Sequence, residues 1–309
     1  MNYYNEIKNK LIDNEIYSKV KDYSKERHKV ITYFEIGRLL TEAGGKYGDN
    51  VIDEYSQKLV VEVGKKYNRR TLFRMKQLYN IFSNEKVSTL WTQLTWSHLR
   101  LLFSLETDSM NYYIKDTINK NLSVRELEFK IKSNEYERLP ESTKNKSAEQ
   151  KESDLVDFIK NPILIKNSNK YDIFSEKVLQ KLILEDIVSF MKELGTGFSF
   201  INNEFKIKVG DSYNYIDLLL YNIKFKCYVV IELKVIKLNS NHTGQIQNYM
   251  NYIDKNVKGI DDNKTVGIII CKQNNQYVID YCSDDRIIAR EYELVWYNYL
   301  GCEEYEKDT

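Results

Sequence analysis

The chain has 309 residues, of which 42% are hydrophobic and 29% charged, and its formal net charge is +1. This composition is typical of a globular protein with one large domain or two ordinary ones. No apolar run approaches the roughly 20 residues that cross a bilayer, and the first residues lack the basic start and apolar core of a signal peptide. We therefore expect a cytoplasmic protein without membrane contacts, in which nucleic-acid binding would depend on local basic patches.

The cysteines and histidines do not indicate a zinc site or a histidine-rich metal site. Four cysteines are present, at Cys227, Cys271, Cys282 and Cys302, and no two of them have CxxC spacing. The three histidines are widely scattered. Cys227 and Cys271 lie in apolar, strand-like runs, so we expect them to be small core residues.

Residues 1–135 are expected to be helical. Apolar residues recur at helical spacing in five segments, which are residues 33–40, 51–63, 72–82, 99–105 and 124–131. Gly44 and Gly45 are predicted to end the first of these helices. Ser123 and Glu126 have the spacing of a capping box, which predicts a helix start at that point.

A basic segment lies in the middle of this helical half. Its cations are Lys65, Lys66, Arg69, Arg70, Arg74 and Lys76. No acidic residue occurs between Glu62 and Glu85, and Tyr67 and Phe73 are interleaved with the cations. Asn68 could cap a helix that begins near Arg69, so the segment is compatible with a helix-turn-helix that presents a basic helix to nucleic acid. The alternatives are a solvated basic face or a protein-binding surface.

The second half predicts an α/β or α+β fold. Residues 137–172 are polar and predict a linker, with a short helix over 154–159. A helix over 175–194 is expected to end at Gly195. Further elements are strands over 198–201, 205–209, 216–221, 227–235, 266–271 and 287–296, and a helix over 244–256. Strands that alternate with helices indicate a sheet with helices on its faces.

The most informative part of this half is Glu232-Leu233-Lys234, which lies inside the apolar run 229–235. Glu232 and Lys234 share one face of such a strand, and buried charges are costly unless they are paired or bind a metal. Asp217 begins a neighbouring apolar strand, so pairing of the two strands can bring Asp217 and Glu232 to one divalent cation. Mg²⁺ and Mn²⁺ suit two carboxylates supplemented by backbone oxygen and water. The alternative is an internal ion-pair network.

These residues resemble the PD-(D/E)XK nuclease superfamily, and their context resembles its YhcG-like family. The segments that carry the resemblance are residues 33–38, 69–75, 193–200, 215–221, 231–234 and 267–272. Glu-x-Lys alone would be a weak signal, whereas this ordered set is specific and covers nearly the whole chain apart from the linker and the two ends. One departure is Ile216, which stands where the superfamily motif has proline, and the family tolerates it.

The resemblance implies a helical domain over 1–136, a linker over 137–172, and a PD-(D/E)XK core with a central mixed sheet over 173–309. Asp217 and Glu232 would then bind Mg²⁺ or Mn²⁺. Lys234 would be the catalytic lysine, which orients the attacking water or neutralises charge on the phosphate.

Three further residues match features of this superfamily. Glu185 matches an acid that the first helix of such a core often adds to the metal site, and the alternative is an exposed helix residue. Gln245 and Tyr249 match a Gln-x-x-x-Tyr motif, share one helix face, and could contact the active site or the scissile strand. The alternative for this pair is ordinary helix packing. A second basic tract could guide a nucleic-acid backbone to the site, and it consists of Lys206, Lys208, Lys224 and Lys226.

We therefore expect a metal-dependent nuclease that hydrolyses phosphodiester bonds in DNA by metal-activated water, with repair or recombination as its setting. The chief alternative is a catalytically inactive module for nucleic-acid binding or protein assembly that retains the nuclease fold. The intact Asp217, Glu232 and Lys234 argue against that alternative. A third interpretation is that the helical half mainly forms a homodimer, which would pair two active sites.

Overall fold

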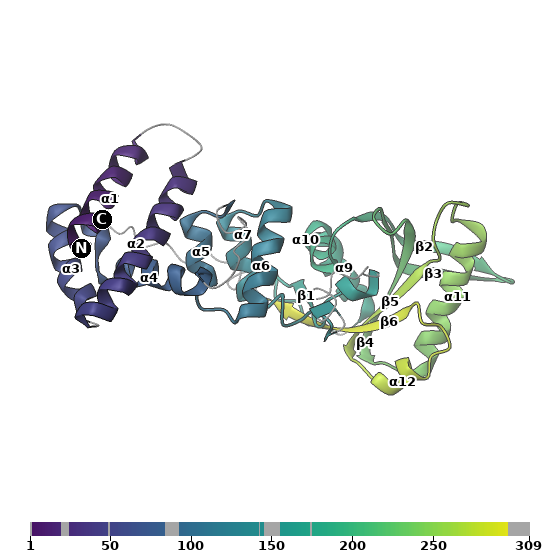
Figure 1. Cartoon of the computed structure of the whole chain (residues 1–309). Coiled ribbons are helices and arrows are strands. Elements are labelled where there is room, and N and C mark those ends of the chain that lie inside the picture. The colour runs from purple at the N-terminus through teal and green to yellow at the C-terminus, as the bar shows by residue number, and fades with distance from the viewer. Residues whose placement is uncertain are drawn as a thin grey trace. The chain divides into compact units, whose positions relative to one another are not determined.

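The structure is a computed structural model that describes residues 2–19, 25–48, 50–83, 93–141, 143–144, 155–173 and 175–295. The chain forms two compact units, Met1–Tyr136 and Glu137–Thr309, with helices alone in the described part of the first and a sheet in the second (Figure 1). None of the described helices has the length and apolar character of a membrane span. Trp296 and Cys302 lie outside the described residues.

The first unit is helical, as predicted. Its elements are α1 (Tyr3–Ser18), α2 (Lys25–Tyr47), α3 (Val51–Glu62), a short 3₁₀ helix η1 (Lys65–Tyr67), α4 (Arg69–Phe82), α5 (Trp96–Leu102), α6 (Thr107–Lys120) and α7 (Val124–Lys132). One hydrophobic core joins these helices, and fully buried side chains such as Leu39, Leu72 and Leu99 come from α2, α4 and α5. The apolar stripes read from the sequence are therefore the faces that pack together.

Two predicted helix starts are confirmed, and one predicted helix end is wrong. The Asn68 side chain accepts a hydrogen bond from the Thr71 backbone N–H and caps α4, and Ser123 forms a capping box with Glu126 at the start of α7. Gly44 and Gly45 do not end a helix, because α2 continues to Tyr47. Gly48 follows with φ of 84°, a left-handed conformation that glycine adopts at little cost.

Gly37 lets α2 approach α4 closely. A Cβ atom at this position would lie 2.0 Å from the Met75 carbonyl oxygen and 2.9 Å from Tyr79 Cβ. Backbone oxygen cannot move away as a flexible side chain could, so only glycine fits. The residues around Gly37 therefore belong to a tight contact between two helices of this unit.

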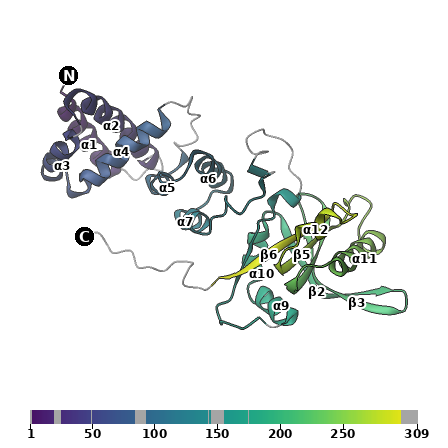
Figure 2. The ribbon, with the colours of Figure 1, turned by 90° about the horizontal axis from the view of Figure 1, so that it is seen from below.

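The second unit contains one mixed sheet of six strands in the order β1-β6-β5-β4-β3-β2. Figure 2 shows the hairpin of β2 and β3 at one end of this sheet. Its strands are β1 (Ile163–Lys166), β2 (Phe198–Val209), β3 (Ser212–Asn222), β4 (Cys227–Lys237), β5 (Val266–Gln273) and β6 (Ile287–Val295). The pairs β1–β6, β6–β5 and β5–β4 are parallel, whereas β4–β3 and β3–β2 are antiparallel. This arrangement confirms the expected mixed sheet.

Helices cover both faces of the sheet, and each face has its own core. On one face, α9 (Glu176–Glu185) and α10 (Ile187–Leu194) pack over side chains that include Leu218, Ile231 and Leu233. On the other face, α11 (Ser240–Asn256) and α12 (Gln276–Asp280) cover residues that include Val230 and Ile269. Cys227 and Cys271 are buried in these cores, as expected. With both faces covered, the middle of β4 is one of the least solvated places in the unit.

Several boundaries in this unit differ from prediction. The expected linker contains the unpredicted strand β1, whereas its predicted short helix is present as a 3₁₀ helix η3 (Leu155–Phe158), whose residue Leu155 joins the core. The helix expected over 175–194 is broken at Asp186, whose side chain caps α10 by accepting from the Ser189 N–H. The strands expected over 198–201 and 205–209 are one strand with an irregularity between Phe200 and Asn202.

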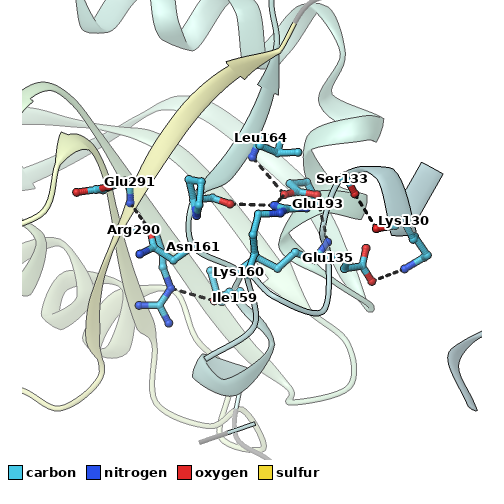
Figure 3. A network of polar contacts seen from close by, with 12 residues as sticks. Lys130, Ser133, Glu135, Ile159, Lys160, Asn161, Leu164, Glu193, Arg290 and Glu291 are labelled. Carbon is cyan, nitrogen blue, oxygen red and sulfur yellow. Dashed lines mark hydrogen bonds and ion pairs between the residues drawn. The ribbon is translucent and has the colours of Figure 1, made fainter. Parts of the chain in front are cut away.

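A buried polar network attaches the segment before β1 to the rest of the unit (Figure 3). The Glu193 carboxylate on α10 forms an ion pair with Arg138, lies 3.1 Å from Lys160 Nζ, and accepts a 3.1 Å hydrogen bond from the Leu164 N–H. Arg290 of β6 donates to the Ile159 carbonyl at 2.9 Å. Because buried ions need partners, these contacts fix Arg138 and residues 159–164 against α10 and β6, so these described parts of the predicted linker belong to the folded unit.

Replacing Gly37 by alanine is expected to lower the free energy of unfolding of the helical unit by about 3 kcal/mol, because the added methyl group overlaps the backbone of α4. Urea unfolding followed by circular dichroism measures the change. The matched control is Gly45→Ala in the same helix, where a Cβ atom meets nothing within 4 Å. This control should stabilise the unit by about 0.5–1 kcal/mol through helix propensity, and equal effects of the two substitutions would contradict the packing argument.

Candidate active site

A pair of opposite charges lies inside β4, in the middle of the sheet. The exposed fractions of Glu232 and Lys234 are only 2% and 6%. Lys234 Nζ lies 2.9 Å from Glu232 Oε1. The two side chains stand on one face of the strand, as their spacing predicts, and their attraction offsets part of the cost of removing each charge from water.

Asp217 meets this pair where β3 and β4 separate. The ladder between the two strands begins at Leu218 and Ile231. Beyond that point the Leu233 N–H donates to Asp217 Oδ2 at 2.8 Å, so a side chain supplies the acceptor that the neighbouring strand no longer offers. Gln180 of α9 donates to the Asp217 backbone carbonyl at 2.9 Å. This bond anchors the backbone of β3 next to the first pair of the β3–β4 ladder. The Asp217 carboxylate is thereby fixed beside the backbone of the Glu232 segment.

Gln245 and Tyr249 complete the cluster from α11. Gln245 Nε2 donates to Glu232 Oε1 at 2.7 Å and lies 2.9 Å from the Tyr249 hydroxyl. The two residues share one helix face, as the spacing predicts. Both oxygens of Glu232 are enclosed, but Oε2 has no hydrogen-bond partner. A buried carboxylate oxygen without a partner is costly and indicates a place for a ligand.

Burial in the cluster raises the pKa values of both acids. Burial first, and the Asp217 carboxylate second, raise the pKa of Glu232 to about 7. Burial also raises the pKa of Asp217, although the Leu233 N–H and Lys234 oppose it. Burial alone would lower the pKa of Lys234, but the neighbouring Glu232 and Glu176 carboxylates raise it above its ordinary value. Two carboxyl groups are therefore held together in a site that disfavours two negative charges.

A third acid near this cluster is Glu176, which the sequence alone did not single out. Glu176 lies in the first turn of α9, and its Oε1 is 3.2 Å from Lys234 Nζ. Glu185 is at the other end of the same helix, where its carboxylate lies 3.3 Å from Asn169 Nδ2 and 4.0 Å from Lys181 Nζ. The structure thus does not bring Glu185 to Asp217 and Glu232. Ser175 marks the start of α9 in the sequence, but no local pattern shows which acid of this helix faces the central strands.

The donor set suits a hard divalent cation only in part. Within the described residues, no group of three or more His, Cys, Asp or Glu side chains is arranged to hold a metal ion. Asp217 and Glu232 alone provide two adjacent carboxylates, and Glu232 Oε2 is available. Backbone oxygen and water are ordinary further ligands of Mg²⁺ and Mn²⁺. The residues present therefore fit an ion whose remaining ligands are not side chains.

The cations of the predicted basic segment differ in their surroundings, and two of them form ion pairs. Lys66 Nζ lies 2.6 Å from Glu15, and Arg69 lies 2.5 Å from Asp53. Lys76 approaches the backbone of α2 near Gly44. Lys65 is exposed in η1.

Arg70 and Arg74 of α4 form a cationic cluster with Arg100 of α5. No carboxylate in the described part of the chain pairs with any of these three arginines. Burial, followed by the charges of Arg100 and Arg70, lowers the pKa of Arg74. Three guanidinium groups near one another without an anion are a candidate phosphate contact.

The second basic tract is also divided. Lys206 and Lys208 are exposed on β2, in the hairpin with β3 that also carries Asp217. Lys224 and Lys226 do not flank the site. They lie in the turn before β4, and Lys224 Nζ is 4.8 Å from the centroid of the Phe158 ring. Lys234 is eight residues beyond Lys226, or about 25 Å along an extended strand.

Comparisons with known proteins assign both halves of the chain. Residues 156–301 match the family model of the YhcG PDDEXK nuclease domain, and residues 11–138 match that of the DUF1016 N-terminal domain. The chain is 23% identical to "Putative nuclease YhcG" of Escherichia coli (strain K12), over 85% of this chain and 82% of that protein.

Likenesses to solved structures are weaker. A repair endonuclease from Pyrococcus abyssi has a TM-score of 0.28 and 16% identity, over 41% of this chain and 49% of that one. A complex of EndoMS with double-stranded DNA has a TM-score of 0.27 and 16% identity, over 40% of this chain and 44% of that one. The aligned regions are thus less than half of those proteins, and TM-scores of this size do not establish a shared activity.

Replacing Glu232 by glutamine is expected to stabilise the metal-free protein at alkaline pH but not at acid pH. Burial raises the pKa of Glu232 from 4.5 to about 7. The stability associated with the protonated carboxyl is therefore complete below pH 4.5 and is lost as pH rises through 7. The free energy of unfolding of Glu232→Gln, relative to wild type, should increase by about 3 kcal/mol between pH 4.5 and pH 8.

Urea unfolding in the presence of EDTA measures this difference at each pH. Glu185→Gln is the matched control, because it removes a half-exposed carboxylate of the same unit that lies outside the cluster, and it should change the free energy of unfolding by less than about 0.5 kcal/mol. A stability difference for Glu232→Gln that does not change with pH would contradict the raised pKa.

Proposed function

Because this chain belongs to the YhcG-like family of PD-(D/E)XK nuclease domain proteins, we propose that it hydrolyses phosphodiester bonds in DNA with Mg²⁺ or Mn²⁺ at the β3–β4 site. The observation that carries this proposal is the unpartnered Glu232 Oε2 beside Asp217 and Lys234, in the centre of a covered sheet. A purely structural ion pair would have no need of a second carboxylate with a raised pKa at its side.

Each residue of the cluster has a distinct role in this proposal. Asp217 and Glu232 would hold the ion, which when bound polarises a phosphoryl oxygen and makes water a better nucleophile. Lys234 would orient the attacking water and stabilise negative charge that develops on the phosphate. Gln245 fixes the Glu232 carboxylate through its 2.7 Å hydrogen bond, and Tyr249 supports Gln245 in turn.

Glu176 replaces Glu185 as the acid of the first helix of the core. After the larger effect of Glu232, the contact of Glu176 with Lys234 also helps to keep the ammonium charged. With a moderate rearrangement of this half-exposed side chain, Glu176 would also approach the ion through water. Lys234 would then exchange a carboxylate partner for the substrate phosphate.

The helical unit is proposed to bind DNA through α4. Arg70, Arg74 and Arg100 provide cations that no described carboxylate neutralises, and the N-terminus of α4 has no acid in its first turn. The order α3, η1, α4 resembles a helix-turn-helix in which α4 would lie against the duplex. Assembly of two copies through this unit would place two active sites on one DNA molecule.

The alternative is a module that binds nucleic acid but does not cleave it. Its specific support is that the described residues lack a third metal-binding side chain of the His, Cys, Asp and Glu classes. Cleavage by the wild-type protein and its dependence on Asp217 distinguish the two functions.

We expect Asp217→Asn, Glu232→Gln and Lys234→Met each to lower the rate of DNA cleavage by about 100-fold or more, because each removes a charge that acts on the reacting phosphate. Glu176→Gln should lower it by about tenfold through Lys234. Linear, circular, single-stranded and branched DNA, incubated with Mg²⁺ or Mn²⁺, provide the assay.

Glu185→Gln is the control on the same helix as Glu176 and should cleave within about twofold of wild type. Millimolar Mn²⁺ should raise the melting temperature of wild type but not that of Asp217→Asn, because only an intact site binds the ion. Wild type that cleaves no substrate would favour the binding module, and equal cleavage by wild type and Asp217→Asn would reject this site.

Replacing Arg70 and Arg74 by alanine is expected to weaken binding to duplex DNA uniformly across sequences. The slope of log affinity against log salt concentration should fall by about 1 for each arginine that contacts a phosphate. Fluorescence anisotropy in EDTA at several salt concentrations measures the slope. Lys58→Ala, which removes a lysine of α3 already paired to Glu54 at 2.8 Å, is the control. The same slope in wild type and the double variant would exclude α4 from the interface.

A further inference from the structure

The hairpin of β2 and β3 projects beyond the rest of the sheet and has one covered side and one bare side. It extends past α11 in both views (Figures 1 and 2). On the covered side, Ile207 and Ile216 are fully or nearly fully buried in the core that α11 shares. Side chains alternate along each strand, so the residues directly before and after Ile207, and the residue directly before Ile216, lie on the opposite side.

The bare side carries two tyrosines and two lysines in register. Lys206 lies directly across from Tyr215, and Lys208 directly across from Tyr213. The exposed fractions of Tyr213 and Tyr215 are 57% and 52%, and Lys206 Nζ lies 3.9 Å from the centroid of the Tyr213 ring. We call these four residues the tyrosine–lysine ladder. In the described part of the chain, neither lysine is paired with a carboxylate.

The ladder ends next to the active site. Tyr213 and Tyr215 are alternate residues of β3, and their exposure alternates with that of the buried Ile216, so they share one side of the strand. The alternation shifts at Asp217, because Ile216 belongs to the core on the α11 side and Leu218 to the core on the α9 side. Asp217 follows Tyr215 by two residues, about 7 Å along the strand, so a chain molecule lying along the ladder would end close to Asp217.

The chemistry of the ladder fits nucleic acid better than protein. Exposed tyrosine rings offer flat faces for nucleobases, and unpaired lysines offer charge for phosphates. The spacing of the two tyrosines indicates whether the bound nucleic acid is stacked in a duplex or unpaired. Alternate residues of a strand are about 7 Å apart, roughly twice the 3.4 Å between stacked bases of one strand in a duplex. The two rings therefore suit bases that are separated from one another.

We infer that the tyrosine–lysine ladder binds an unpaired nucleic-acid strand and directs it into the β3–β4 site, an inference that rests on the proposed nuclease function. Bases would stack on Tyr213 and Tyr215, while Lys206 and Lys208 contact the phosphates between them. The substrate of this site is then a single strand, or a duplex with an unpaired segment next to the scissile phosphate.

Binding measurements on the full chain in EDTA test this inference without cleavage. The probes are a fluorescein-labelled single-stranded DNA, the same strand in a duplex, and single-stranded RNA of the same sequence. Tyr213→Ala and Tyr215→Ala should each weaken binding of the single strand by about fivefold or more, and binding of the duplex by less than about twofold. Tyr215→Phe keeps the ring and should bind as wild type does. The DNA and RNA probes distinguish the two sources of an unpaired strand.

Tyr277→Ala is the matched control, because Tyr277 is a 76% exposed tyrosine of α12 in the same unit and lies outside the ladder. Equal losses on single strand and duplex, or no loss on either, would overturn the inference, provided that the variants melt at the wild-type temperature. A separate assay with Mn²⁺ tests cleavage by wild type. Loss of single-strand affinity in the variants with no cleavage by wild type would refute the nuclease proposal alone.

Discussion

The charge pair Glu232–Lys234 in the middle of β4 is the constraint on which the second unit depends. Both faces of the sheet are covered by helices, so neither charge reaches bulk water, and each must be satisfied from within the fold. The elements around the pair meet this demand. The first turn of α9 supplies a carboxylate for the lysine, α11 supplies an amide for the glutamate, and the separation of β3 from β4 admits Asp217. One glutamate oxygen is left over, and under the proposed function this oxygen would bind the cation.

Much of this arrangement follows from sequence, because its signals are local. A strand that is apolar apart from Glu232 and Lys234 specifies both its burial and the face that the two charges share. Gln245 and Tyr249, one helical turn apart, specify a common helix face. The caps at Asn68 and Ser123 are equally local, since a short polar side chain bonds the backbone three residues ahead.

The errors arose where distant parts of the chain decide the outcome. Glu176 and Glu185 lie on one helix and look alike in sequence, and only the direction in which α9 crosses the sheet selects Glu176. Strand β1 is four residues long and pairs with β6, more than 120 residues later, so no local pattern marks it. The break at Asp186 depends on a side chain that serves as a cap rather than a helix residue. Glycine is a weak helix former, so Gly45 predicts a helix end, and the packing of α2 overrides that preference.

The position of β2 at the end of the sheet has a consequence for solubility. Among the described residues, no strand pairs with the outer edge of its twelve residues, and such an edge can pair with the edge of another molecule. The irregularity at Phe200–Asn202, the positive φ of Glu204 and the charges of Lys206 and Lys208 all hinder that pairing. The hairpin that is proposed to bind an extended nucleic-acid strand thus also has an edge that can pair with a second copy of the chain. Its lysines favour a polyanion over a second β-strand.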